Sequence, residues 1–418
     1  MSTDYSWTKH DGVWKRKLGG METFYLTLAS PEGHPVHWMV GCCVSLLYHG
    51  KDSVDIQDAL WQAWKDTRLK LPTLASTVDR ANGEIVVSED TSGVAMDEWL
   101  RKSFQSPHAL IDGRGMLQLY HSLFTALGNP PTQNSTDTAF ISPLNLALPY
   151  NKWLGLSPSP SKSNLTVAES IFRRILDQQQ PIRLSGVDFD IQPQLATHTD
   201  LVLTEYETQS IIAACKQRDI TLTSAWHAAL AMAAKTIQSA AGEKGTSFAQ
   251  FTTIDLRRWF PPHFRPREDS IGSLQTALPF AIDLDRDNTF EALSGTLHAH
   301  YKDPFAFADH DFNYLTPYMA ASKQFLEAGG VPPSSTPSLS SMGKIGDFLA
   351  DRYGDWELTD FWISSTMLTG DFQMYSWTFR GRLAFSVCYN EAFYDYSDVK
   401  AVLDETRHQI LTGLGVVL

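Results

Sequence analysis

The 418-residue chain lacks the features that mark several large classes of protein. It has only four cysteines, none in a CxxC spacing, so neither a disulfide framework nor a cysteine-based zinc site is expected. We interpret them as buried free thiols in a reducing compartment: Cys42, Cys43, Cys215 and Cys388. No apolar run approaches the roughly 18 residues of a membrane-spanning helix, and residues 1–17 lack the apolar core of a signal peptide. The sequence therefore predicts a cytoplasmic protein with no membrane partner.

Positive charge is also scarce. The chain has 34 Lys and Arg against 47 Asp and Glu, a net charge of −13. This balance argues against a nucleic-acid partner, because neutralising phosphates requires clustered Lys and Arg. Aromatic residues, in contrast, are abundant, with 12 Trp, 14 Tyr and 22 Phe. Such side chains bury large areas and can line an apolar pocket.

Common catalytic signatures are missing as well. There is no GxGxxG or GxxxxGK[ST] loop for nucleotide phosphates, no GxSxG nucleophile elbow and no HExxH zinc motif. The nearest group to a metal site consists of His298, His300, His310 and Asp311. Because His298 and His300 lie two apart on a predicted helix, their side chains point in different directions and do not converge on an ion. We therefore expect neither a metal nor a bound cofactor.

Length and hydrophobic patterning predict two lobes, at residues 1–190 and 191–418. A chain of 418 residues exceeds what one hydrophobic core usually serves. Strand and helix patterns are mixed in both halves, so each lobe is expected to be an α/β unit, a mixed sheet with covering helices. The clearest predicted strands are 36–48, 83–88 and 382–390, and the clearest predicted helices are 53–66, 96–104, 115–128, 221–237 and 397–411.

Two patterns in the second half are specific enough to name residues. Thr204 with Glu207 three positions later predicts a capping box at a helix start, and Thr221 or Thr223 is the expected cap of the next helix. In the predicted strand 382–390, one face carries Leu383, Phe385, Val387 and Tyr389.

The stretch PHALIDGRG at residues 107–115 carries the most suggestive chemistry. An imidazole such as that of His108 has a near-neutral pKa suited to removing a proton from a hydroxyl. A carboxylate nearby, here Asp112, can fix the ring or the backbone around it, and Gly113 and Gly115 allow a sharp turn. Three fixed residues recur by chance, however, so the motif alone also accommodates an ordinary histidine before a turn.

Further stretches occur in an order that resembles one superfamily. They are 5–24 (YSWTKHDGVWKRKLGGMETF), 198–233, 253–262 (TIDLRRWFPP), 338–343 (SLSSMG) and 378–395 (TFRGRLAFSVCYNEAFYD). Together with the HxxxDG pattern they resemble the CoA-dependent acyltransferases, which include the plant BAHD enzymes, peptide-synthetase condensation domains and fungal trichothecene O-acetyltransferases. The resemblance covers nearly the whole chain and is nearest to the group like trichothecene 15-O-acetyltransferase.

The resemblance implies a fold of two similar chloramphenicol-acetyltransferase-like lobes around a solvent tunnel. It implies that His108 is the general base, that Asp112 is a structural residue paired with Arg257, and that Gly113 supports the turn. Candidate tunnel or oxyanion groups are Ser340, Ser341, Gly343 and Asn390. The expected reaction is transfer of an acyl group, by analogy acetyl, from acyl-CoA as co-substrate to a hydroxyl of a fungal secondary metabolite such as a terpenoid. A monomer is expected.

Two alternatives remain open. The same fold serves condensation-like enzymes that use a carrier-protein thioester or catalyse a cyclisation, and a non-catalytic protein could hold an apolar ligand in the tunnel.

The sequence departs from the family in three places. Residues 371–375, DFQMY, lack the glycines of the BAHD DFGWG motif, and Pro107 replaces the first histidine of condensation domains. The predicted helix 96–104 also leads almost directly into the motif. Either the apolar strand expected before His108 is missing, which favours the binding protein, or residues that precede Pro107 in the protein are absent from this sequence.

Overall fold

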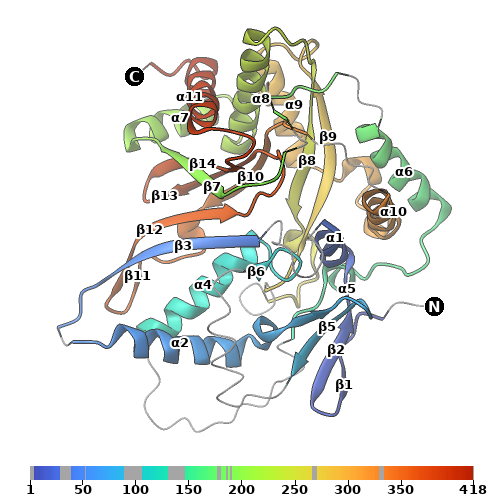
Figure 1. Ribbon diagram of the computed structural model, residues 1–418, viewed down its shortest axis with the longest axis vertical. Helices are drawn as coiled ribbons and strands as arrows, with labels where there is room; N and C mark the ends of the chain where they lie inside the picture. The colour runs from blue at the N-terminus through green and yellow to red at the C-terminus, as the bar shows by residue number, and fades with distance from the viewer. Residues whose placement is uncertain are drawn as a thin grey trace.

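The computed structural model describes residues 4–28, 39–51, 53–88, 106–129, 146–176, 180–184, 187–188, 191–265, 271–328 and 334–417. Within them the predicted mixed α/β fold is confirmed, and Figure 1 shows helices packed around several sheets. The predicted helix 96–104 and residues 36–38 of the first predicted strand lie outside the described residues.

The described strands form three four-stranded sheets and one two-stranded ribbon. The β1 sheet has the order β1 (Thr8–His10), β2 (Val13–Lys17), β5 (Glu84–Ser88) and β4 (Thr77–Asp79). The β3 sheet has the order β11 (Arg352–Tyr353), β12 (Trp356–Ser365), β3 (Met39–Tyr48) and β6 (Ser106–Pro107). The β7 sheet has the order β10 (Ser338–Lys344), β13 (Gln373–Phe379), β14 (Arg382–Asn390) and β7 (Ala196–Val202). The β8–β9 ribbon pairs Ser247–Asp255 with Gln275–Asp283.

Helices cover these sheets. The α-helices are α1 (Gly20–Leu28), α2 (Ile56–Lys70), α4 (Gly113–Gly128), α5 (Tyr150–Trp153), α6 (Lys162–Leu176), α7 (Glu205–Gln217), α8 (Leu222–Ala240), α9 (Phe290–Lys302), α10 (Leu315–Glu327) and α11 (Tyr396–Gly413). Short 3₁₀ turns are η1 (Pro72–Ala75), η3 (Arg257–Trp259), η4 (Ala306–Ala308), η5 (Phe312–Tyr314) and η6 (Ile345–Asp347). In Figure 1, α7, α8 and α11 lie over the β7 sheet, while α2 and α4 lie on the opposite side, beside β3.

The helix starts follow from capping side chains in the sequence. The capping box of Thr204 and Glu207 begins α7 as predicted, and Thr221, the first of the two candidate caps, begins α8 by accepting from the Ser224 amide. At α4 the cap is Asp112, whose side chain accepts from the Gly115 amide. Each of these oxygens satisfies a backbone donor that a helix start leaves unpaired.

Strand β14 of the β7 sheet is buried on both faces. On β14 the predicted apolar face, including Phe385 and Val387, packs under α7, α8 and α11. The other face contributes Ala384 and Cys388 to a second core with α2 and α4. A third core gathers α1, α6, α10 and one end of the β8–β9 ribbon. All three cores therefore draw residues from the two halves of the chain, and the boundary at 190/191 stays a prediction.

Strand β12 is the clearest case of the two halves of the chain joining in one sheet. It comes from the second half of the chain but pairs antiparallel with β3, placing Phe361 opposite Val44. Cys42 on β3 is buried, whereas its neighbour Cys43 is exposed, because successive side chains of a strand point to opposite faces. The expectation that all four cysteines are buried was therefore wrong at Cys43.

Among the described residues, the structure has no helix with the length and apolar character that spanning a membrane requires.

Candidate active site

A short strand does stand in front of His108. Ser106 and Pro107 form β6, which pairs antiparallel with Val40 and Met39 at the edge of the β3 sheet. These two residues are too few to form the apolar strand expected there, and residues 89–105 lie outside the described residues, so whether that strand is missing stays open. The turn that follows β6 carries His108 and leads into α4.

His108 lies in the wall of a cavity of about 1000 Å³. Its ring stacks on Tyr25 of α1, with ring centroids 3.9 Å apart and planes 10° from parallel. Its Nε2 atom lies 3.5 Å from the side-chain amide nitrogen of Gln275, which also donates to the Tyr25 hydroxyl at 2.8 Å. Burial, the largest influence, lowers the pKa of His108 to about 4, against smaller opposing effects of its own backbone and of Asp112. The imidazole is therefore neutral at physiological pH and can accept a proton.

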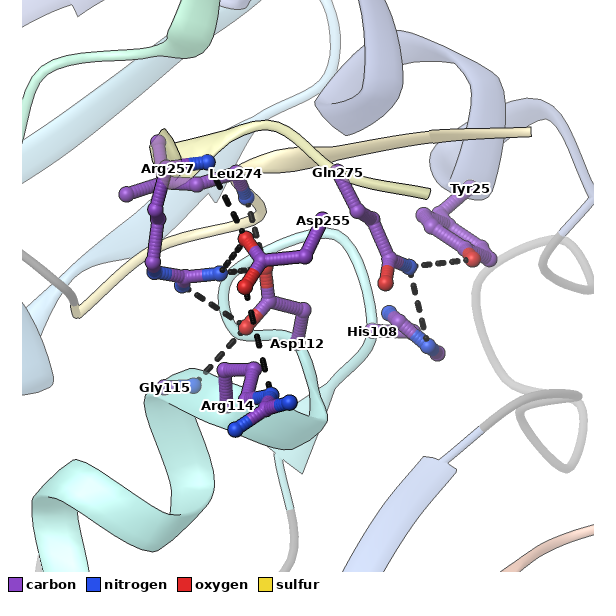
Figure 2. A network of polar contacts seen from close by, with 9 residues as sticks. All are labelled: Tyr25, His108, Asp112, Arg114, Gly115, Asp255, Arg257, Leu274 and Gln275. Carbon is purple, nitrogen blue, oxygen red and sulfur yellow. Dashed lines mark hydrogen bonds and ion pairs between the residues drawn. The ribbon is translucent and has the colours of Figure 1, made fainter. Parts of the chain in front are cut away.

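Asp112 points away from the histidine, as Figure 2 shows. Its side chain is 1% exposed and accepts hydrogen bonds from the Gly115 and Leu274 amides, both at 2.8 Å. The two terminal nitrogens of Arg257 complete a bidentate ion pair, at 2.8 and 3.0 Å. A buried carboxylate with this many donors is held in one position, so Asp112 fixes the turn between His108 and α4 and joins it to the β8–β9 ribbon.

Arg257 is shared between two carboxylates. Its Nη1 also donates to Asp255 at 2.9 Å, and Asp255 in turn lies 3.9 Å from Arg114. Burial alone would lower the pKa of Arg257, but the charges of Asp112 and Asp255 outweigh burial and raise it. The guanidinium is therefore a permanent charge that balances the buried Asp112.

Three further candidates lie together on β10. Ser340, Ser341 and Gly343 all line the same cavity as His108. The Ser341 hydroxyl lies 3.0 Å from that of Thr223. The pairing of β10 with β13 shifts register between Ser341 and Gly343, and Gly343 has φ +73°, a conformation in which glycine is favoured.

Asn390 is the exception among the predicted site residues. It is fully buried, and its amide nitrogen donates to the carbonyls of Gln194 and Met367, both at 3.0 Å. Its oxygen accepts from the amides of Gln194 and Ala392, at 2.8 and 3.1 Å. It does not line the cavity, so its assignment as a tunnel or oxyanion group was wrong. Its place at the end of β14 makes it a link between neighbouring loops.

Sequence reasoning missed Tyr25 and Gln275. Gln275 opens β9 directly opposite Asp255, the last residue of β8, so the DLRR segment and the glutamine beside His108 share one end of this ribbon. Tyr25 reaches the site because α1 is anchored by a buried ion pair, in which Arg16 donates to Glu22 at 2.6 and 2.8 Å. The sequence offered no signal for Tyr25, which directly follows the N-terminal resemblance that ends at Phe24.

The cavity combines apolar and cationic surfaces. Its apolar wall includes side chains from α1, α6 and α10: Phe24, Leu28, Phe172, Phe325 and Leu326. Its cationic lining residues are Arg114, Arg183 and Arg258, against the acids Asp255 and Asp371. A local excess of positive charge is notable in a chain of net charge −13. Among the described residues no three His, Cys, Asp or Glu side chains converge as a metal site.

The fold is that shared by fungal acetyltransferases and peptide-synthetase domains, and the resemblance inferred from the sequence is confirmed. The trichothecene 15-O-acetyltransferase of Fusarium sporotrichioides superposes with a TM-score of 0.82, at 14% identity over 99% of both chains. The epimerization domain of the third module of tyrocidine synthetase B gives 0.63, at 12% identity over 99% of this chain and 98% of that domain.

Two proteins of Monascus ruber are similar in sequence over almost the full length. Acetyltransferase pigO is 25% identical, covering 97% of each chain. O-acetyltransferase pigM is 26% identical, covering 97% of this chain and 87% of its own. No protein-family model matches the chain.

Proposed function

We propose that this protein is an acyl-CoA-dependent O-acyltransferase of fungal secondary metabolism, with acetyl-CoA as donor and a small-molecule alcohol, such as a terpenoid, as acceptor. The observation that carries the proposal is a neutral imidazole in the wall of a large cavity, in the fold of an acetyltransferase. The full-length likeness to two proteins named as acetyltransferases supports the same reaction class.

His108 acts as the general base in this proposal. Its Nε2 accepts the proton of the acceptor hydroxyl as that oxygen attacks the thioester carbonyl, so a C–O bond forms and a tetrahedral intermediate results. The C–S bond then breaks, and the departing CoA sulfur takes the proton back from His108. No covalent acyl-enzyme is required, because the cavity holds donor and acceptor beside one base.

Other groups of the cavity have supporting roles. Ser340 and Ser341 present hydroxyls from β10 that can hydrogen-bond the donor carbonyl or its oxyanion. Arg114, Arg183 and Arg258 supply positive charge for the phosphates of CoA. Asp112 and Arg257 do not react; their ion pair holds the turn that presents His108.

A carrier-protein thioester is the second candidate donor. The same fold occurs in the epimerization domain of a peptide synthetase, and the thioester chemistry at the base would be identical. The two donors differ in what lies beyond the sulfur, a soluble nucleotide in one case and a folded protein in the other.

The donor can be established by measuring free thiol in four samples: acetyl-CoA and an acetylated carrier protein, each with and without acceptor. Incubation with a panel of fungal terpenoid alcohols should release CoA only when an acceptor is present. Turnover with the carrier alone would replace the CoA proposal by the carrier-protein one. Tight binding of an alcohol with no turnover of either donor would show a ligand-binding protein.

A further inference from the structure

The Tyr25 hydroxyl stands beside the base with a hydrogen to donate. Gln275 Nε2 donates to the phenolic oxygen at 2.8 Å, so this oxygen already acts as an acceptor. Among the described residues no acceptor takes the phenolic hydrogen. Tyr25 and Gln275 both line the cavity, so this hydrogen can reach a ligand there.

The same amide nitrogen joins the phenol to His108. Gln275 Nε2 lies 3.5 Å from His108 Nε2, so one atom bridges the hydroxyl of Tyr25 and the ring nitrogen that would take the acceptor's proton. A thioester carbonyl attacked by an oxygen at Nε2 therefore develops its negative charge next to the phenol. Burial raises the pKa of Tyr25, which keeps the phenol protonated and able to donate.

We propose that Tyr25 is a catalytic residue whose hydroxyl donates a hydrogen bond to the oxyanion of the tetrahedral intermediate. This inference rests on the proposed acyl transfer. Gln275 is then a positioning residue: by donating to the phenolic oxygen, it directs the phenolic hydrogen into the cavity. The stacked ring of Tyr25 separately supports the plane of His108.

The variant Tyr25→Phe separates the two roles of the side chain, because it keeps the stacked ring and removes only the hydroxyl. We expect kcat to fall about 100-fold with little change in KM for either substrate, since an oxyanion donor acts mainly in the transition state. The acidic limb of the kcat–pH profile should stay where it is in the wild type. Tyr120→Phe is the matched control: it also removes a buried hydroxyl, which donates to the Cys42 carbonyl at 2.6 Å, but lies outside the cavity lining. It should keep the wild-type kcat.

Gln275→Glu tests independently whether the direction of the hydrogen bond between residue 275 and the Tyr25 hydroxyl matters. Its carboxylate would accept the phenolic hydrogen, so the variant should lose kcat at pH 8 although Tyr25 is intact. Because the carboxylate also lies near His108 Nε2, the loss should be smaller in the Tyr25→Phe background; an equal loss in both backgrounds would contradict the role of Tyr25. A Tyr25→Phe variant with a kcat within about threefold of wild type would overturn the proposal, as would a loss that comes entirely from a shifted acidic limb. Either result leaves acyl transfer by the wild type standing, whereas an inactive wild type with every acyl-CoA would remove the proposed function itself.

Discussion

Removing the Asp112 carboxylate should destabilise the protein more than any nearby change of charge. In Asp112→Ala the buried Arg257 loses its bidentate partner, and the Leu274 and Gly115 amides lose their acceptor. Breaking a buried ion pair from one side costs about 3–5 kcal/mol, and losing the cap of α4 adds about 1 kcal/mol. We expect the free energy of unfolding to fall by about 4–6 kcal/mol, measured by urea denaturation.

Asp255→Asn provides the comparison. Asp255 also pairs with Arg257, at 2.9 Å, but its side chain is 39% exposed. A pair of this kind contributes about 1 kcal/mol or less, so this variant should remain close to the wild type. If Asp112→Ala lost no more stability than Asp255→Asn, the reasoning that the buried ion pair fixes the turn would be refuted.

Three further predictions follow from burial and hydrogen bonding. Because burial lowers the pKa of His108 to about 4, His108 stays neutral as pH falls through the ordinary histidine range near 6.5, and kcat should decline only as pH approaches 4; a decline centred near 6.5 would contradict this. Asn390→Ala should lower the free energy of unfolding by about 2–3 kcal/mol, since it leaves buried carbonyls without a donor, while kcat of the folded enzyme stays unchanged; a lower kcat at full folding would return Asn390 to the site. Cys43 should react with iodoacetamide in the native protein, as read by mass spectrometry, whereas Cys42, Cys215 and Cys388 should not. Burial shields these three thiols and raises their pKa. Equal labelling of all four would contradict the burial.

Local patterns in the sequence predicted α2, α4, α7, α8, α11 and the apolar face of β14. Capping chemistry at Thr204 and Thr221 and periodic hydrophobicity are short-range signals, so they survive without tertiary information. The pairing of β3 with β12 and the two-residue β6 depend on chain segments far apart. The hydrophobic pattern of one segment does not reveal which distant segment pairs with it.

The same distinction separates the site residues that motifs in the sequence predicted from those that only tertiary packing brings together. His108 and Asp112 lie four apart, and the ordered resemblance added Arg257. Tyr25 and Gln275 reach His108 only through the packing of α1 and the β8–β9 ribbon. Asn390 was misassigned because a motif position does not reveal that both ends of its amide are already bound inside the protein.

Acyl transfer by His108 is the central claim, and the rate of ester formation measures it directly. The assay follows the mass of the acetylated alcohol together with equimolar free CoA, for wild type and His108→Ala at pH 7.5. His198→Ala is the matched control, because His198 also stacks on an aromatic ring, that of Trp362 at 4.4 Å, but does not line the cavity. The account predicts a loss of at least about 100-fold for His108→Ala, the typical contribution of a positioned base, with His198→Ala near the wild-type rate. Equal rates for wild type and His108→Ala would contradict it.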